Sequence, residues 1–440
     1  MTGPWTRTGE FRARILRNGI FLVGGSGTAA MLAMATSAIN ARALSLAEFG
    51  QIALLQSAAL LIAGLVTVSV QQPVIKLGVS ALQRGQRREF EELVALGLIA
   101  DIAGAIVAAA IGAATLVFLD YTRGLSAPTM TAGWIVAGSL LFQGYRTSEA
   151  IFRVFDRFAK LGALQIVAAA IGTLLAVVLW WHHAPFAIYG WLVGCQVALP
   201  AILQLVFALR LMRQNGLAIR WRQAALTKTQ RSEFVAYCWT TSVVSALDSL
   251  RAYGDTSLVG GFLSVEAAGL YNVAKQVAGV FRKGAQVYNS VLFPEIATLA
   301  GEPTTVRARM VLRRAVTGSA IFTLIIGFAA ALLGPWALAL VFGSSFTEAA
   351  DVTTLLCIAA GVQIISATFS MFVQVYVGPQ HLVPAYLMAL PAFIIAIFML
   401  IPVYDLEAAG IAQIVFYGVL TLSLWRHLAQ KMAIAGGDTC

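Results

Sequence analysis

Residues 93–119 read LVALGLIADIAGAIVAAAIGAATLVFL, and Asp101 is the only charged residue among them. A helix of this length rises about 40 Å, which exceeds the roughly 30 Å hydrocarbon layer of a bilayer. Similar runs recur along the chain, in which hydrophobic residues make up 59% and charged residues 11% of 440 positions. Soluble domains are about 45–50% apolar and about 25% charged. The sequence therefore predicts an all-α integral membrane protein.

Counting these runs predicts about twelve transmembrane helices. The expected segments are 19–39, 50–70, 93–119, 132–152, 162–181, 189–209, 234–263, 267–293, 315–342, 352–377, 382–403 and 408–425. The ninth is expected to break near Gly334-Pro335, because proline removes a backbone donor and clashes with the preceding turn. Residues 76–92, between the second and third helices, are expected to form a loop.

The distribution of basic residues predicts the orientation. With a cytoplasmic N-terminus, 23 of the 30 lysines and arginines fall in cytoplasmic segments and only Arg42 and Arg123 in outer loops. Such a bias is typical of inner-membrane proteins. It predicts a multi-pass protein of the cell inner membrane with both termini in the cytoplasm. The net charge of +10 is thereby explained by topology rather than by binding to nucleic acid.

The two halves of the chain echo one another. Residues 44–50 (LSLAEFG) and 263–269 (LSVEAAG) stand 219 positions apart, close to half the length. This offset favours two parallel six-helix repeats, although Glu-x-x-Gly is also a convenient outer hairpin. The predicted organisation is a basic cytoplasmic N-terminal segment 1–18, a bundle 19–209, a cytoplasmic linker 210–233, a second bundle 234–425 and a cytoplasmic tail 426–440.

Several expected helices carry ionisable residues, which are costly in hydrocarbon and therefore need a reason. Arg146 and Glu149 are three apart and are expected to meet on one helix face. Asp248, Arg251 and Asp255 are spaced three and four, so Arg251 is expected between two carboxylates. These groups either neutralise one another and orient helices or take part in transport.

The eighth expected helix carries a polar stripe. Lys275, Gly279, Arg282, Gln286 and Asn289 recur at intervals of four, three, four and three, which places them on one helix face. A cationic stripe in a membrane helix should face water, neighbouring acids or a bound anion. Lysine and arginine make charge-assisted hydrogen bonds to phosphate, so a phosphate-bearing lipid fits this face.

Other functional classes find little support in the sequence. No Gly-x-x-x-x-Gly-Lys-Ser/Thr loop is present, and the four cysteines show no metal-ligand spacing. The outer loops are short and carry no acidic pair of the kind that a membrane-bound glycan polymerase or ligase would need. We therefore expect no enzymatic activity, no cofactor and no metal.

Four stretches in order along the chain carry a family resemblance. They are 42–53 (RALSLAEFGQIA), 265–274 (VEAAGLYNVA) with 292–296 (LFPEI), 340–346 (LVFGSSF), and 400–404 (LIPVY) leading to 408–410 (AAG). On these landmarks the chain resembles the polysaccharide transporter branch of the multidrug/oligosaccharidyl-lipid/polysaccharide exporter (MOP) superfamily, the Wzx-like flippases.

The resemblance implies two six-helix bundles around a central cationic cavity that works by alternating access. It implies a flippase that moves polyprenyl-diphosphate-linked oligosaccharide from the cytoplasmic to the outer leaflet for surface polysaccharide synthesis (exopolysaccharide, capsule or O-antigen). Expected partners are this lipid-linked glycan and the bilayer, with a polysaccharide polymerase and export machinery as further candidates. The runner-up is a cation-coupled exporter of small molecules or drugs from the same superfamily.

Charge and spacing assign roles to ten residues. The expected substrate-binding residues are Lys275, Arg282, Arg251, Arg146, Gln286 and Asn289. The expected coupling or charge-pairing residues are Asp101, Glu149, Asp248 and Asp255.

Overall fold

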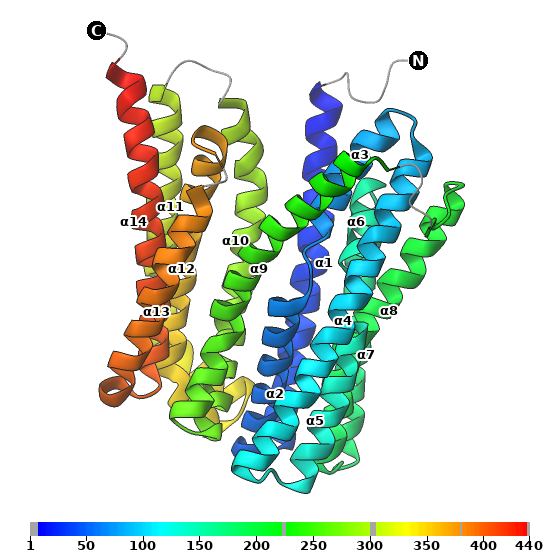
Figure 1. Ribbon diagram of the computed structural model, residues 1–440. Coiled ribbons are helices and arrows are strands. Elements are labelled where there is room, and N and C mark those ends of the chain that lie inside the picture. Colours follow the sequence, from blue (N-terminus) through cyan, green and yellow to red (C-terminus); the bar gives the residue numbers. More distant parts are fainter. Residues whose placement is uncertain (1–7, 222–225, 300–304, 379–380, 438–440) are drawn as a thin grey trace. The chain divides into compact units, whose positions relative to one another are not determined.

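The protein is all-helical in the computed structural model, which describes residues 8–221, 226–299, 305–378 and 381–437 (Figure 1). Within these residues the chain forms fourteen α-helices and two short 3-10 helices, and no strand. The α-helices are α1 (Thr8–Ala43), α2 (Leu46–Val66), α3 (Gln71–Gln83), α4 (Arg87–Arg123), α5 (Ala127–Ser139), α6 (Arg146–Val154), α7 (Phe158–Trp181), α8 (Phe186–Gln214), α9 (Lys228–Phe262), α10 (Val265–Leu299), α11 (Thr305–Val341), α12 (Ala350–Tyr376), α13 (Leu382–Tyr404) and α14 (Glu407–Gly437). The 3-10 helices are η1 (Leu140–Phe142) and η2 (Ser344–Ala349).

In the described residues, eight helical segments are long and apolar enough to cross a membrane. They are α2, α4, α7, α8, the stretch Arg309–Val341 of α11, η2 with α12, α13, and the stretch Glu407–Gln430 of α14. The other four expected segments coincide with α1, α9 and α10 and with the interrupted α5–η1–α6 run. Helices α9 and α10 are not among these eight segments because they carry more polar residues. These include Asp248, Arg251 and Asp255 on α9 and Lys275 and Arg282 on α10.

Two expectations about helix breaks are wrong. The fourth segment, expected to be continuous over 132–152, is broken at Gln143–Tyr145 between η1 and α6. The ninth, expected to break near Gly334-Pro335, is continuous, and Pro335 lies inside α11. Membrane helices tolerate proline because neighbouring groups satisfy the freed carbonyl, whereas a break in lipid would expose further backbone groups.

A helix was also missed. Residues 76–92 were expected to be a loop, but α3 covers Gln71–Gln83 and α4 begins at Arg87. The apolar side of α3 is buried through Pro73, Val74 and Ala81. Because α3 is short and carries Lys76, its composition resembles a polar connection more than a membrane helix.

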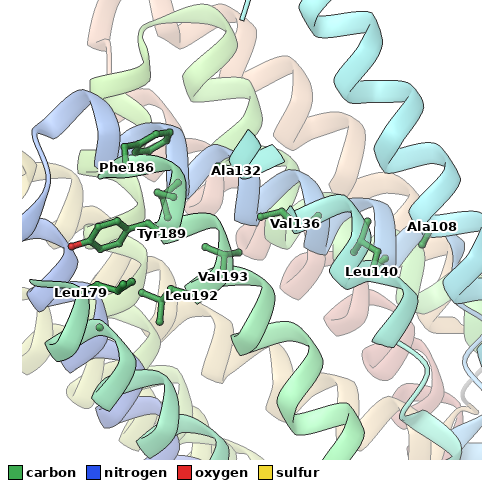
Figure 2. Packing of buried hydrophobic residues seen from close by; sticks show 13 residues of the cluster. Ala108, Ala132, Val136, Leu140, Leu179, Phe186, Tyr189, Leu192 and Val193 are labelled. Atoms are coloured by element: carbon green, nitrogen blue, oxygen red, sulfur yellow. The ribbon is translucent and has the colours of Figure 1, made fainter. Parts of the chain in front are cut away.

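The chain divides into two compact units, which we describe separately. Unit 2 contains residues 24–44 and 51–257, and unit 1 contains the start of α1 up to Val23, residues 45–50 and the chain from Leu258 onward. The core of unit 2 joins residues of α2, α4, α5, α7 and α8, including Ala132, Val136 and Tyr189 (Figure 2). Small residues allow close packing here, since the Cα of Ala132 lies where a side chain on Gly190 would point.

Most of α9 packs in unit 2. Hydroxyl groups join it to the middle of α2 and to the turn after α2: Ser57 Oγ donates to the carbonyl of Tyr253 (2.6 Å), and Ser69 Oγ donates to Ser245 Oγ (2.7 Å). The predicted second bundle starts at residue 234. The predicted bundles are repeats defined by order along the chain, whereas the two compact units are defined by which residues pack together. The units therefore do not test the boundaries of the five predicted segments, which stay a prediction.

Part of the predicted linker 210–233 is helical, because α8 extends to Gln214 and α9 begins at Lys228. Two buried glutamates of α4 hold the described residues that connect α8 to α9. Glu91 accepts hydrogen bonds from the backbone of Ala218 and from Arg220, and Glu92 accepts one from the backbone of Leu226.

In unit 1, α11, α12, α13 and α14 run alongside one another (Figure 1). The two echoing stretches also meet in this unit. Gly269, at the start of α10, faces Gly50: a Cβ at Gly269 would stand 3.2 Å from the Gly50 Cα, and a Cβ at Gly50 would overlap the carbonyl of Val265. The echo therefore marks a close crossing of two helix starts, and the smallest residue is required on both sides.

Candidate functional site

The N-terminus of α6 is held by a buried carboxylate from α4. The backbone N–H of Thr147 donates to Asp101 Oδ2 (2.9 Å), and Asp101 is only 1% exposed. A carboxylate here caps a free helix N–H and interacts favourably with the helix dipole. Gly144 permits this arrangement, because a Cβ at this position would stand 3.1 Å from the Asp101 carbonyl oxygen.

Charged and phenolic groups gather around this break. Arg146 and Glu149 lie at the start of α6, and with Asp101 they lie within electrostatic range of the Tyr145 hydroxyl. Tyr253 of α9 belongs to the same neighbourhood. The structure thus brings Asp101, Arg146 and Glu149 together in unit 2, although they come from two sequence segments.

Arg146 and Glu149 both lie in the first turn of α6, but the ion pair of Glu149 is made with another cation. Glu149 forms its ion pair with Arg153, four residues later, rather than with Arg146. A glutamate followed by a cation at i+4 is a favourable order on a helix, and Arg153 stands within α6. Arg146 instead lies at the first position of α6, where its charge attracts Asp101.

The expected charge group on α9 is confirmed for one of its two pairs. Arg251 Nη2 lies 3.0 Å from Asp248 Oδ1, and the arginine side chain is buried (5% exposed) while the aspartate is open (53% exposed). Asp255 is fully buried and accepts a hydrogen bond from the backbone N–H of Thr256 (2.6 Å). The predicted contact of Arg251 with Asp255 stays a prediction.

The cationic face of α10 lies in unit 1. Arg282 extends back along its own helix over Gly279, and its Nη2 donates to the carbonyl of Lys275 (3.3 Å). The ammonium of Lys275 lies 5.6 Å from the centre of the Tyr271 ring, a cation–π contact. The expectation that Lys275 and Arg282 share one face is therefore confirmed. The side chains of Gln286 and Asn289 lie outside the part that the structure describes.

Sequence reasoning missed three side chains of these groups: Tyr145, Arg153 and Tyr271. Tyr271 stands four residues before Lys275, a spacing that places both on one helix face, so this contact was available to sequence reasoning. Arg153 lies just beyond the expected segment 132–152, so it was counted among the cytoplasmic basic residues and not as a partner of Glu149. Tyr145 gave no periodic signal, since it lies in the break.

The arrangement offers two kinds of chemistry. The α10 face presents an ammonium and a guanidinium, which suit phosphate. The α4–α6 region presents a buried carboxylate at a helix N-terminus, which suits proton or cation binding. Within the described ranges, His, Cys, Asp and Glu side chains form no group of three or more that could hold a metal ion.

Comparisons with known proteins agree on family and fold. A family model described as "Polysaccharide biosynthesis protein" matches residues 15–300. The inner membrane protein YghQ of Escherichia coli strain K12 is 24% identical over 351 residues, which cover 79% of this chain and 97% of YghQ.

Two solved structures show the fold. An inward-facing multidrug resistance MATE family transporter of the MOP superfamily matches with a TM-score of 0.72 at 10% identity, covering 93% of this chain and 95% of its own. A mutant of the Vibrio cholerae MATE transporter VcmN matches with a TM-score of 0.67 at 12% identity, covering 96% and 98%. The expected all-α membrane fold with two repeat bundles is confirmed.

Proposed function

The chain belongs to the polysaccharide biosynthesis protein family, among the membrane transporters of the MOP superfamily, and from this we propose that it is a lipid-linked oligosaccharide flippase. Its substrate would be an oligosaccharide on a polyprenyl diphosphate. It would carry this lipid from the cytoplasmic to the outer leaflet of the inner membrane, for the synthesis of a surface polysaccharide.

The cationic face of α10 carries this proposal. A charged side chain in the middle of a membrane helix costs about 2.5–3.5 kcal/mol on insertion scales, so Lys275 and Arg282 together represent a considerable cost. A diphosphate would offset that cost through charge-assisted hydrogen bonds. The Tyr271 ring beside Lys275 and the Lys275 carbonyl beside Arg282 help to orient the two cations.

Further groups are assigned supporting roles. Arg146 and Arg251 would contact the phosphates or sugars at other stages of transport, and Gln286 and Asn289 would extend the polar face of α10. Asp101, Glu149, Asp248 and Asp255 would couple transport to cations or compete with the substrate for the basic groups. The two bundles would alternate between access to the cytoplasm and access to the outside.

The test is the double substitution Lys275→Ala with Arg282→Ala. We expect surface polysaccharide to be lost in a strain that depends on this protein. In detergent, the affinity for undecaprenyl diphosphate should fall about 100-fold or more, because each of the two charge-assisted hydrogen bonds contributes about 1.5–3 kcal/mol. Undecaprenol, which lacks the phosphates, should bind both proteins equally.

The matched control removes one arginine and one lysine elsewhere. Arg157→Ala with Lys160→Ala changes two exposed residues at the start of α7 and should leave both readouts unchanged. Normal polysaccharide export by the Lys275/Arg282 variant, at wild-type expression, would remove the α10 face from the proposal.

A second candidate is a cation-coupled exporter of small molecules, in line with the drug-exporting class named for the solved structures. The specific observation in its favour is Asp101, a buried carboxylate at a helix break in the membrane. Deletion of the gene discriminates the two candidates. Intact surface glycans with increased drug sensitivity would favour the exporter, whereas loss of a glycan would favour the flippase.

A further inference from the structure

A cavity at one end of unit 1 combines two arginines with an apolar wall. It has a volume of about 430 Å³ and lies between α11, α12 and α14. Arg309 and Arg313 of α11 border it, together with Phe369 of α12 and Trp425 of α14. We propose that this cavity binds the headgroup of an anionic glycerophospholipid, with the phosphodiester between the two arginines.

The spacing of the arginines favours a shared anion. Arg309 and Arg313 are four residues apart, so they lie one above the other on the same face of α11. A phosphodiester between the two guanidinium groups can accept a charge-assisted hydrogen bond from each of them.

The remaining wall suits the glycerol and the start of the acyl chains. Leu312, Val316, Phe369 and Ala429 contribute apolar surface to the same cavity. A soluble anion such as inorganic phosphate would leave this surface wet, whereas a lipid covers it. The apolar wall therefore favours a phosphate that carries hydrocarbon.

The depth of the cavity matches the edge of the hydrocarbon layer. Trp425 stands 18 residues after the start of α14 at Glu407, about 27 Å along the helix. Phe369 stands 19 residues after the start of α12 at Ala350, about 28 Å along it. Both rises are close to the roughly 30 Å hydrocarbon thickness, and tryptophan is enriched at this boundary.

The surface of α11 beyond the cavity continues toward the membrane centre as an apolar track. Leu324 lies eleven residues after Arg313, which returns to nearly the same face of the helix, and it is 73% exposed. Phe328, one turn further, is 72% exposed. An acyl chain that starts at the cavity can follow these side chains.

The predicted orientation of the chain indicates that the bound lipid would come from the cytoplasmic leaflet. The cavity adjoins the first turns of α11 and the last turns of α14, the regions assigned to the cytoplasmic side by the basic residues. Anionic lipids of that leaflet attract juxtamembrane arginines by about 1 kcal/mol each, so the cavity would be filled from the surrounding membrane.

The experiment measures thermal unfolding of the purified full-length protein in detergent. Dioleoylphosphatidylglycerol should raise the Tm in a saturable manner, and dioleoylphosphatidylcholine should not. The variant Arg309→Gln with Arg313→Gln should lower the apparent affinity for phosphatidylglycerol about tenfold or more. The variant Ala429→Phe fills the cavity without changing its charge and should have the same effect, so the test does not depend on the arginine variant folding.

The matched control is Arg87→Gln with Arg88→Gln, which removes the same charge from an exposed helix start and should keep the wild-type response. Equal responses of wild type and both cavity variants would overturn the proposal. So would an equal response to inorganic phosphate, which would assign a soluble-anion site, or displacement of phosphatidylglycerol by undecaprenyl diphosphate, which would assign a substrate site. The α10 variant should respond as wild type, so this site is tested separately from the proposed transport function.

Discussion

The carboxylate of Asp101 explains how a membrane helix can be interrupted at little cost. A break in lipid leaves backbone N–H groups without partners, and each such group is expensive. Asp101 reaches across from α4 and accepts the hydrogen bond of Thr147 at the new helix start. Its negative charge lies beside the positive end of the α6 dipole and within range of Arg146, so a buried charge and a helix break stabilise each other.

This arrangement predicts different effects for two substitutions. Asp101→Ala leaves the Thr147 N–H buried without an acceptor and should lower the free energy of unfolding by about 1–3 kcal/mol. Asp101→Asn keeps an oxygen acceptor and should cost less than half as much. The measurement is the Tm of the purified variants in detergent.

The control is Asp248→Asn, which changes a carboxylate that is 53% exposed and should shift the Tm by less than Asp101→Ala does. Equal losses for Asp101→Asn and Asp101→Ala would mean that the charge, not the capping hydrogen bond, holds α6.

Helical spacing predicted some side-chain partners and not others. Arg251 with Asp248, and Lys275 with Arg282, were expected to share faces, and they do. Arg146 and Arg153 both lie within about one helical turn of Glu149, and spacing alone does not predict which of them forms the ion pair. In the structure the pair is made with Arg153. The local pattern therefore limits the candidate partners, while the path of the helix selects one of them.

The starts of α2 and α10 show what the repeated sequence does. In the first copy, Ser45 and Glu48 form a reciprocal capping box, in which Ser45 N–H donates to Glu48 Oε2 (3.0 Å) and Glu48 N–H donates to Ser45 Oγ (3.3 Å). In the second copy, Ser264 Oγ accepts from the N–H of Ala267 (3.0 Å). The glycine that follows, Gly50 or Gly269, then packs against the other copy.

This crossing predicts that Gly50→Val is strongly destabilising. Its side chain would overlap the Val265 carbonyl, and backbone atoms cannot rearrange as a side chain can. Overpacking of this kind costs about 1–3 kcal/mol or more. The folded yield after detergent extraction, measured by size-exclusion chromatography, should fall sharply.

Gly318→Val is the comparison for this experiment, because Gly318 also lies within a helix and has no atom within 4 Å of a built Cβ. It should extract like wild type. A Gly50→Val protein with wild-type yield and Tm would show that the two helix starts do not cross closely.

Connections between helices were harder to predict than the helices themselves. The run α5–η1–α6 reads as one apolar segment, and its break depends on a carboxylate some forty residues earlier in the chain. Conversely, Pro335 suggested a break that α11 does not show. Proline and glycine mark where a helix can bend, but the packing around them decides whether it does.

For the molecule as a whole, the distribution of arginine and lysine predicts the orientation in the membrane. In a background without Cys195, Cys238, Cys357 and Cys440, single cysteines at exposed positions report it. Thr122→Cys, near the end of α4, should react with a membrane-impermeant maleimide in intact spheroplasts. Asn215→Cys, just after α8, should react only after permeabilisation.

Both cysteines should react fully in permeabilised membranes, which confirms that each site is accessible. Labelling of Asn215→Cys, but not of Thr122→Cys, in intact spheroplasts would reverse the orientation and with it the proposed direction of transport.

The membrane environment, the positions of most helices and the cationic face of α10 all follow from local properties: apolar length, composition and helical spacing. Neighbouring residues in the chain express these properties whatever they pack against. The break before α6, the helix α3, the attachment of α9 to α2 and the turn after it, and the Gly50–Gly269 crossing depend instead on residues far apart in the chain. Only the folded chain brings such residues together, because a buried carboxylate or a missing Cβ acts on whatever backbone lies next to it in space.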